Sequence, residues 1–177
     1  MEIVQSNWLS LLMEKARLPY AGAVGAKLLY PDSEIIQHAG ITNLRVGPAH
    51  KLQFLSDDVN HYYGRNKGVH DVMAVTGACL LVKKEIFDRV GGFETELAVA
   101  FNDVDFCLKV RKAGYLVVYN PAVKAYHYES KSRGAEDTPE KIARFEREIA
   151  YMKEHWPDIL KDGDPYYNKC LTLNKTN

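Results

Sequence analysis

The sequence predicts an α/β fold in which a mixed sheet is flanked by helices. Short apolar runs bounded by glycine or proline predict buried strands, and between them lie segments whose apolar residues recur at helical spacing. Strands and helices therefore alternate along the chain, which is typical of α/β architecture. The length of 177 residues suits one domain, residues 1–177, with a sizeable core.

The first third of the chain predicts one helix and two strands. Residues 6–17, SNWLSLLMEKAR, predict a helix with Ser6 as its N-terminal cap. The apolar run in residues 22–31 predicts a buried strand, and residues 32–41 predict a turn followed by a second, shorter strand. Residues 42–71 show no periodicity, so this segment is predicted to be irregular, as functional loops often are.

The middle of the chain contains its strongest strand pattern, residues 72–84, VMAVTGACLLVKK. Gly77 lies at the centre of this pattern, and a glycine inside a strand indicates close approach of a ligand or of another backbone segment. Residues 84–92 predict a short helix that ends at a glycine pair. Residues 103–114 predict a second helix, which is also closed by a glycine.

The last third predicts two strands and one long helix. Residues 115–121 and 123–129 predict separate strands, divided by an Asn-Pro pair, and residues 130–137 predict a polar loop. Residues 139–156 predict a C-terminal amphipathic helix, with Thr138 as the cap and a proline in the first turn.

Composition restricts the classes of partner and compartment. The 23 basic and 23 acidic side chains give zero net charge, which argues against a nucleic-acid surface as the main partner. The three cysteines are widely spaced and form no CxxC, which indicates a reducing compartment. Neither a signal-peptide pattern nor a membrane-spanning apolar run is found. We therefore expect a cytoplasmic protein, and peripheral membrane association stays compatible with the sequence.

The stretch FNDVDFC, residues 101–107, places two carboxylates at the start of a predicted helix. Because successive helical residues are about 100° apart, Asp105 falls on the side of Lys109, an ion-pair partner, whereas Asp103 falls on the apolar side with Phe106. The helix dipole helps to keep a carboxylate ionised there, so Asp103 is the candidate general base. Acids are also favoured in a first helical turn for stability alone, so a structural role stays open for both.

A histidine, an amide and a polar loop supply further candidates. His127 lies at the end of the strand predicted for residues 123–129. The loop after it offers Ser130 and Arg133, which are donors suited to a diphosphate, although a solvated surface loop would explain them equally. Gln37, in the motif QHAG, is a weaker candidate. The histidines of residues 42–71 lack the spacing of metal ligands, which favours a structural role.

Five segments together resemble the second half of a family 2 glycosyltransferase. In chain order they are VGAKLLYPDSEIIQHAG, VTGACLLVKKEIFDRVGGF, ELAVAFNDVDFCLKVRKAGYLVVYNP, AYHYESKSRG and DPYYN. The resemblance runs from about Glu2 to Leu173, and it is strongest toward rhamnosyltransferase-like members that build bacterial surface polysaccharides. Each motif alone is weak, but five in the same order are specific.

This resemblance implies a partial GT-A-type fold, that of nucleotide-diphospho-sugar transferases, and an inverting transfer of a sugar from a nucleotide-diphosphate donor to the hydroxyl of a saccharide acceptor. The family's catalytic base is the first aspartate of an E/N-D-x-D motif, which matches Asp103. Asn102 and Asp105 match the flanking positions, for which the resemblance implies substrate binding. Thr76 and Gly77 match the TGA segment that floors the acceptor site.

The resemblance also implies a divalent cation, Mg²⁺ or Mn²⁺. His127 of the YHxES pattern matches a histidine that completes the metal site. Ser130 and Arg133 would then bind near the donor diphosphate, and Gln37 would contact substrate.

The sequence departs from the family because its nucleotide-binding first half, with the D-x-D motif, has no counterpart. We therefore expect a fragment that is inactive alone and binds nucleotide sugars weakly. An uncovered sheet edge is expected to promote self-association or to be covered by a rearranged terminus.

Two other classes of function stay open from the residues. One is a non-catalytic domain that binds sugar or protein. The other is a metal-dependent hydrolase that uses Asp103, Asp105 and His127, although no clear further ligand accompanies them.

Overall fold

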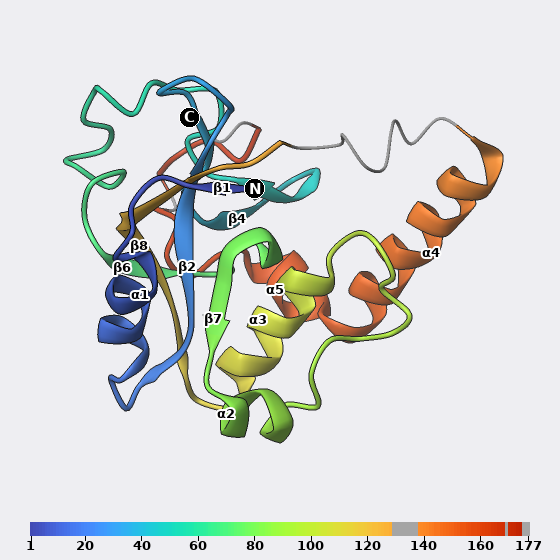
Figure 1. Ribbon diagram of the computed structural model, residues 1–177. Helices are drawn as coiled ribbons and strands as arrows, with labels where there is room; N and C mark the ends of the chain where they lie inside the picture. The colour runs from blue at the N-terminus through green and yellow to red at the C-terminus, as the bar shows by residue number, and fades with distance from the viewer. Residues whose placement is uncertain (129–137, 169, 175–177) are drawn as a thin grey trace.

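The computed structural model describes residues 1–128, 138–168 and 170–174. Two long strands, β2 (Ala21–Leu29) and β8 (Leu116–Tyr126), run parallel through its centre (Figure 1). All nine residues of β2 are buried, as expected for a strand whose apolar run is continuous rather than alternating. The buried strand predicted for residues 22–31 is confirmed.

Four short strands complete a six-stranded mixed sheet. All four pair antiparallel to the central strands: β3 (Ile36–His38) and β7 (Leu80–Val82) with β2, and β1 (Glu2–Ile3) and β6 (His70–Val72) with β8. The mixed sheet predicted from the sequence is therefore confirmed. Its long strands lie inside and its outer strands are two or three residues long. Self-association through an edge stays a prediction.

Helices cover both faces of the sheet, and each face has its own apolar core. Helix α1 (Trp8–Ala16) packs Leu12 against Val24 and Val118. Helix α3 (Asn102–Lys112) contributes Phe106 and Val110 to the core on the other face, which also includes the short helix α2 (Lys84–Arg89). Figure 1 shows α1 and α3 on opposite sides of β2. The α/β layering expected from alternating elements is thus observed.

The strand predicted for residues 72–84 is wrong in its centre. Strand β6 ends at Val72, a 3-10 helix occupies Gly77–Cys79, and β7 begins only at Leu80. The Thr76 hydroxyl accepts the Ala78 N–H at 3.3 Å, and this cap stabilises the turn in place of strand pairing. A closer approach to this segment occurs at Gly25, where an added Cβ would lie 2.5 Å from Val75 Cβ.

The two strands predicted around residue 121 form the single strand β8. The register against β2 shifts between Asn120, opposite Ala26, and Lys124, opposite Lys27. Pro121 lies in this irregularity, where its missing N–H removes no ladder hydrogen bond. The Asn120 amide donates to the Leu11 carbonyl at 2.9 Å, which fastens α1 to the same point.

Residues 42–71 are more regular than predicted, because β4 (Ile41–Leu44) and β5 (Gly47–His50) form a hairpin within them. The cap predicted at Ser6 is also wrong, since Asn7 precedes α1 and makes no side-chain capping bond. Of the described helices, none is long and apolar enough to cross a membrane. All three cysteines lie in the described part of the chain and are free thiols.

The long helix predicted for residues 139–156 is confirmed as α4 (Pro139–His155), with the Thr138 side chain as its cap. The buried Glu148 carboxylate accepts the N–H groups of Val99 and Ala100 at 3.0 Å, so α4 holds the loop that leads into α3. A short helix, α5 (Pro157–Asp162), follows and was not predicted. Figure 1 shows the first turns of α4 reaching away from the sheet.

Candidate functional site

The site is built around Asp103, in the first turn of α3. Phe101 precedes the helix in a left-handed conformation, with φ of 63°, which turns the chain so that the helix begins at Asn102. The Asp103 carboxylate accepts two main-chain hydrogen bonds, from Gly77 N–H at 2.8 Å and from Val104 N–H at 2.9 Å. Its side chain is half-buried. The structure therefore brings Asp103 together with the predicted TGA segment.

Asp105 has different surroundings from those of its neighbour in the motif. Its side chain is buried, its Oδ2 forms an ion pair with Lys109 at 2.8 Å, and its Oδ1 accepts the Trp156 indole N–H at 2.9 Å. The predicted ion pair with Lys109 is confirmed. The projection of the apolar side was wrong, because Asp105 is the more deeply buried acid: Trp156, which follows α4, covers this face of α3.

His127 and Gln37 form a second pair of predicted residues. The Gln37 amide donates to the His127 carbonyl at 3.2 Å, so its Oε1 faces the ring and accepts from His127 Nδ1 at 2.8 Å. This contact fixes the tautomer of a neutral His127 ring, with the proton on Nδ1 and the lone pair on Nε2. Metal-ligating histidines commonly donate their other ring N–H in this way, and a metal-ligand role for His127 stays a prediction.

His38, for which the sequence predicted no role of its own, lies between Gln37 of the His127 pair and Thr76 of the TGA segment. Its Nε2 accepts the N–H groups of Gly40 and Thr76, both at 3.3 Å, so its proton must lie on Nδ1, which donates to His50 Nδ1 at 3.0 Å. Burial lowers the pKa of His38 well below its usual range, and nearby His50 and His127 lower it further. A neutral His38 thus supports the segment that carries the Asp103 hydrogen bond.

The predicted metal site is incomplete within the described residues. No group of three histidine, cysteine, aspartate or glutamate side chains there is arranged to hold an ion. Asp103, Asp105 and His127 therefore do not form the cluster that a metal-dependent hydrolase would need. Ser130 and Arg133, the predicted donor contacts, lie outside the described residues. Asn102 is half-buried at the start of α3, beside Asp103.

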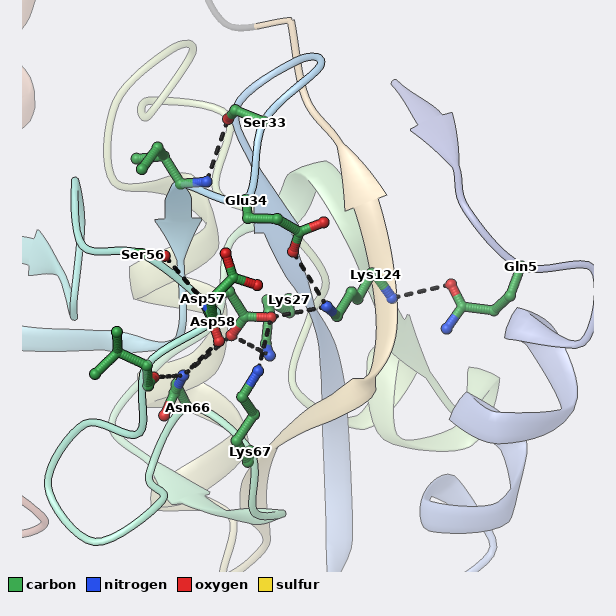
Figure 2. A network of polar contacts seen from close by, with 12 residues as sticks. Gln5, Lys27, Ser33, Glu34, Ser56, Asp57, Asp58, Asn66, Lys67 and Lys124 are labelled. Carbon is green, nitrogen blue, oxygen red and sulfur yellow. Dashed lines mark hydrogen bonds and ion pairs between the residues drawn. The ribbon is translucent and has the colours of Figure 1, made fainter.

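A separate charged cluster surrounds Asp57, and sequence reasoning missed it (Figure 2). The buried Asp57 carboxylate forms ion pairs with Lys27 at 2.7 Å, Lys124 at 2.8 Å and Lys67 at 3.3 Å. The amide of Asn66 also donates to it, at 3.1 Å. Because Lys27 and Lys124 stand opposite each other on the two central strands, this cluster fastens the loop around residue 57 to the sheet.

The electrostatics of Asp57 fit a structural role. Burial by itself would raise its pKa, but the hydrogen bonds and charges of Lys124 and Lys27 outweigh burial and lower the pKa to about 2. Burial also lowers the pKa of Lys27, against the opposing effect of Asp57. Lys27 is the least exposed of the three lysines, at 1% of its side-chain area, so it depends most on this partner. Strand alternation alone would not have revealed a buried lysine on β2.

The chain is similar in sequence to one protein named for O-antigen biosynthesis, to one named as a rhamnosyltransferase and to one uncharacterized protein. It is 35% identical over 99% of its length to the O-antigen biosynthesis protein RfbC of Myxococcus xanthus. It is 29% identical over 71% of its length to an N-acetylglucosaminyl-diphospho-decaprenol L-rhamnosyltransferase of Mycobacterium tuberculosis. It is 49% identical over 98% of its length to the uncharacterized protein y4gI of Sinorhizobium fredii.

These relatives are much longer than the chain. The matched part spans 19% of y4gI, 14% of RfbC and 43% of the rhamnosyltransferase. No protein-family model matches the sequence. The similarity thus supports homology to glycosyltransferase-type proteins, and any activity of a whole relative is a separate question for this chain.

Proposed function

We propose that the chain is the acceptor-binding and catalytic part of an inverting glycosyltransferase of polysaccharide biosynthesis, with a GT-A-type fold. The names of the relatives support the reaction class, and the geometry of Asp103 supports the mechanism. The observation that carries the proposal is the pairing of a half-exposed helix-start carboxylate with the Gly77 N–H of the TGA segment.

Asp103 is positioned to act as a general base. Two main-chain N–H donors, of Gly77 and Val104, fix the orientation of its carboxylate. Each carboxylate oxygen keeps a second lone pair, so one can accept the proton of an acceptor hydroxyl. The deprotonated oxygen then attacks the anomeric carbon of the donor sugar, the bond to the diphosphate breaks, and the configuration inverts.

The other predicted residues have roles in substrate binding and in support. Thr76 and Gly77 would form the floor beneath the acceptor, with Asn102 at its side. Asp105 would act through α3, because its ion pair with Lys109 and its bond to Trp156 fix the helix that carries Asp103. Gln37 would act through His127, whose ring orientation it fixes. Ser130 and Arg133 would serve the donor diphosphate.

A divalent cation, Mg²⁺ or Mn²⁺, would stabilise the departing diphosphate, with His127 as one ligand. The described residues supply no complete ligand set, so further ligands would come from the donor phosphates or from acids elsewhere. His127→Ala should raise the cation concentration needed for half-maximal activity and lower cation affinity in a binding titration, with the fold preserved. If activity of His127→Ala depends on the cation concentration as that of the parent does, His127 has a structural role.

A non-catalytic sugar- or protein-binding domain is the second candidate. It is favoured by the small share of each relative that the chain spans. On either view we expect the 177 residues alone to show no glycosyl transfer, because they contain no counterpart of a nucleotide-binding half.

Asp103→Asn in an active enzyme that contains this chain tests the proposal. Loss of a general base should lower kcat by about two to four orders of magnitude while donor affinity changes little. Asp88→Asn, which removes an exposed carboxylate on α2, is the matched control and should retain full turnover. If kcat of Asp103→Asn stays within about tenfold of the parent value, Asp103 is not the base.

A further inference from the structure

A pocket outside the Asp103 site joins the DPYYN motif to the loop of residues 51–70. Its volume is about 570 Å³, within the range of small-molecule sites. Four tyrosines line it, Tyr62 and Tyr63 from the loop and Tyr166 and Tyr167 from the motif. Ala39, adjacent to His38, also belongs to its wall, so the pocket lies next to the group that supports Thr76.

The walls of the pocket combine aromatic rings with positive charge. Lys51 and the exposed Arg65 both line it. The Arg111 guanidinium of α3 lies 4.7 Å from the centre of the Tyr166 ring, which anchors the motif against the helix. Tyrosine faces pack against the C–H face of a sugar ring, and paired cations bind phosphate. The same pocket therefore suits both halves of a sugar phosphate.

A buried histidine nitrogen in the pocket wall points to a hydroxylated ligand. His70 Nδ1 donates to the Gly68 carbonyl at 2.9 Å, which leaves the lone pair of the neutral ring on Nε2. Burial lowers the pKa of His70 to about 4, so the ring is neutral at physiological pH. His70 lines the pocket, and its Nε2 is the atom of that lining that is buried without a hydrogen-bond partner among the described residues. A ligand hydroxyl, or a water that it holds, would satisfy this acceptor.

The loop that lines the pocket is strained in a way that favours a binding role. Leu52, Tyr62 and Tyr63 all have positive φ, at 57°, 45° and 60°, which large side chains rarely adopt. The Tyr63 side chain is fully exposed. A backbone that holds two neighbouring tyrosines in this conformation costs stability, and it presents their rings at the mouth of the pocket.

We propose that this pocket binds a saccharide that carries a phosphate or diphosphate, with the tyrosines on the sugar ring and with Lys51 and Arg65 on the phosphate. A free sugar phosphate, a lipid-linked saccharide and a nucleotide sugar all share this chemistry. Its identification as the acceptor of glycosyl transfer rests on the proposed function. Binding itself does not rest on the proposed function, because Asp103 does not line the pocket.

Titration of the ¹⁵N-labelled chain with N-acetylglucosamine 1-phosphate tests the proposal by NMR. We expect saturable shifts at the pocket residues, with a dissociation constant within about tenfold of 1 mM, and binding of N-acetylglucosamine at least tenfold weaker. Arg65→Gln should weaken the sugar phosphate about tenfold and leave the neutral sugar unchanged. Arg17→Gln, an exposed arginine on the C-terminal side of α1, is the control and should change neither.

Tyr63→Asn removes the ring but keeps a residue that tolerates positive φ, and it should weaken the sugar and the sugar phosphate equally. If a short-chain prenyl diphosphate sugar binds more tightly than a nucleotide sugar, the ligand is the lipid-linked saccharide. If the nucleotide sugar binds more tightly, the ligand is the nucleotide sugar. No shifts up to about 10 mM, or equal effects of Arg65→Gln and Arg17→Gln, would overturn the proposal.

Binding of UMP without binding of N-acetylglucosamine 1-phosphate would also overturn it, in favour of a nucleoside site. Asp103→Asn should bind the sugar phosphate as the parent chain does. Retained binding together with full turnover of Asp103→Asn would therefore contradict the catalytic assignment but leave the pocket proposal intact.

Discussion

Asp57 and Asp103 are two aspartates with several donors each, in two differently built regions. Asp57 is completely buried, and three lysines and an amide surround its carboxylate (Figure 2). Asp103 is half-buried, and its hydrogen bonds within the described residues come from the main-chain N–H groups of Gly77 and Val104. The first carboxylate is enclosed by cations that come from the central strands and a loop. The second is held in place by backbone and stays open on one side.

The difference shows how surroundings separate a structural acid from a candidate base. Ammonium groups around Asp57 lower its pKa to about 2, so it accepts no proton at neutral pH. Neutral N–H donors orient Asp103 without enclosing it, so its oxygens stay accessible to a hydroxyl. Both positions are aspartates near turns in the sequence, and the folded chain distinguishes them by burial and by the identity and number of their donors.

Asp57→Asn should have the largest effect on folding. The substitution leaves Lys27 buried without its counter-charge, which should lower the free energy of unfolding by about 3–5 kcal/mol. Chemical denaturation measures this change. The matched variant Asp103→Asn loses one hydrogen bond at a half-exposed site, and about 1 kcal/mol is expected. Equal losses of unfolding free energy for the two variants would contradict the distinction between the enclosed Asp57 and the half-buried Asp103.

Acid should destabilise the fold through Asp57 in a defined pH window. Its pKa in the folded chain, about 2, lies below the usual value of 3.8, so its contribution is fully present above about pH 4 and is lost as pH falls toward 2. The shift corresponds to about 2 kcal/mol. Unfolding free energies measured between pH 5 and pH 2 should show this loss. A folded variant without the Asp57 carboxylate should lack that part of the pH dependence.

Gly25→Ala and Gly77→Ala test the packing around the TGA segment that holds Asp103, and we expect smaller effects on stability. A Cβ at Gly25 would lie 2.5 Å from Val75 Cβ and displace the segment before the TGA turn, so a loss of about 1–3 kcal/mol is expected. A Cβ at Gly77 would meet Asp103 Cβ at 3.5 Å, which is ordinary contact, and the loss should stay under about 1 kcal/mol. Thermal unfolding of both variants gives the order, and the reverse order would contradict the geometry.

Helices α1 to α4 could be predicted from the sequence because their signals are local, whereas the short α5 was missed. Thr138 caps α4 within three residues, and the acids of α3 lie in its own first turn. The conformation of residues 72–84 could not be predicted from such local signals. Their apolar pattern favours a strand, but the Gly77 N–H finds its acceptor in Asp103, 26 positions later in the chain. A distant partner decided between two local conformations.

The candidate site was predicted in part. The NDVD motif identified Asp103, and the structure places it against the predicted TGA segment. His38 was missed because its role depends on two main-chain donors that only the folded chain brings to its ring. The Asp57 cluster was missed for the same reason, since its lysines come from β2, β8 and a loop.

The parallel pairing of β2 with β8 also sets the order in which the domain can assemble. Ala21 stands opposite Leu116, so the two central strands are separated by roughly 95 residues of chain, and parallel contacts at such separation form slowly. During synthesis, β2, which is mostly apolar, has no partner strand β8 until most of the chain has been made. Over that interval it is the segment most exposed to wrong pairing, and the speed of folding depends on the late arrival of β8.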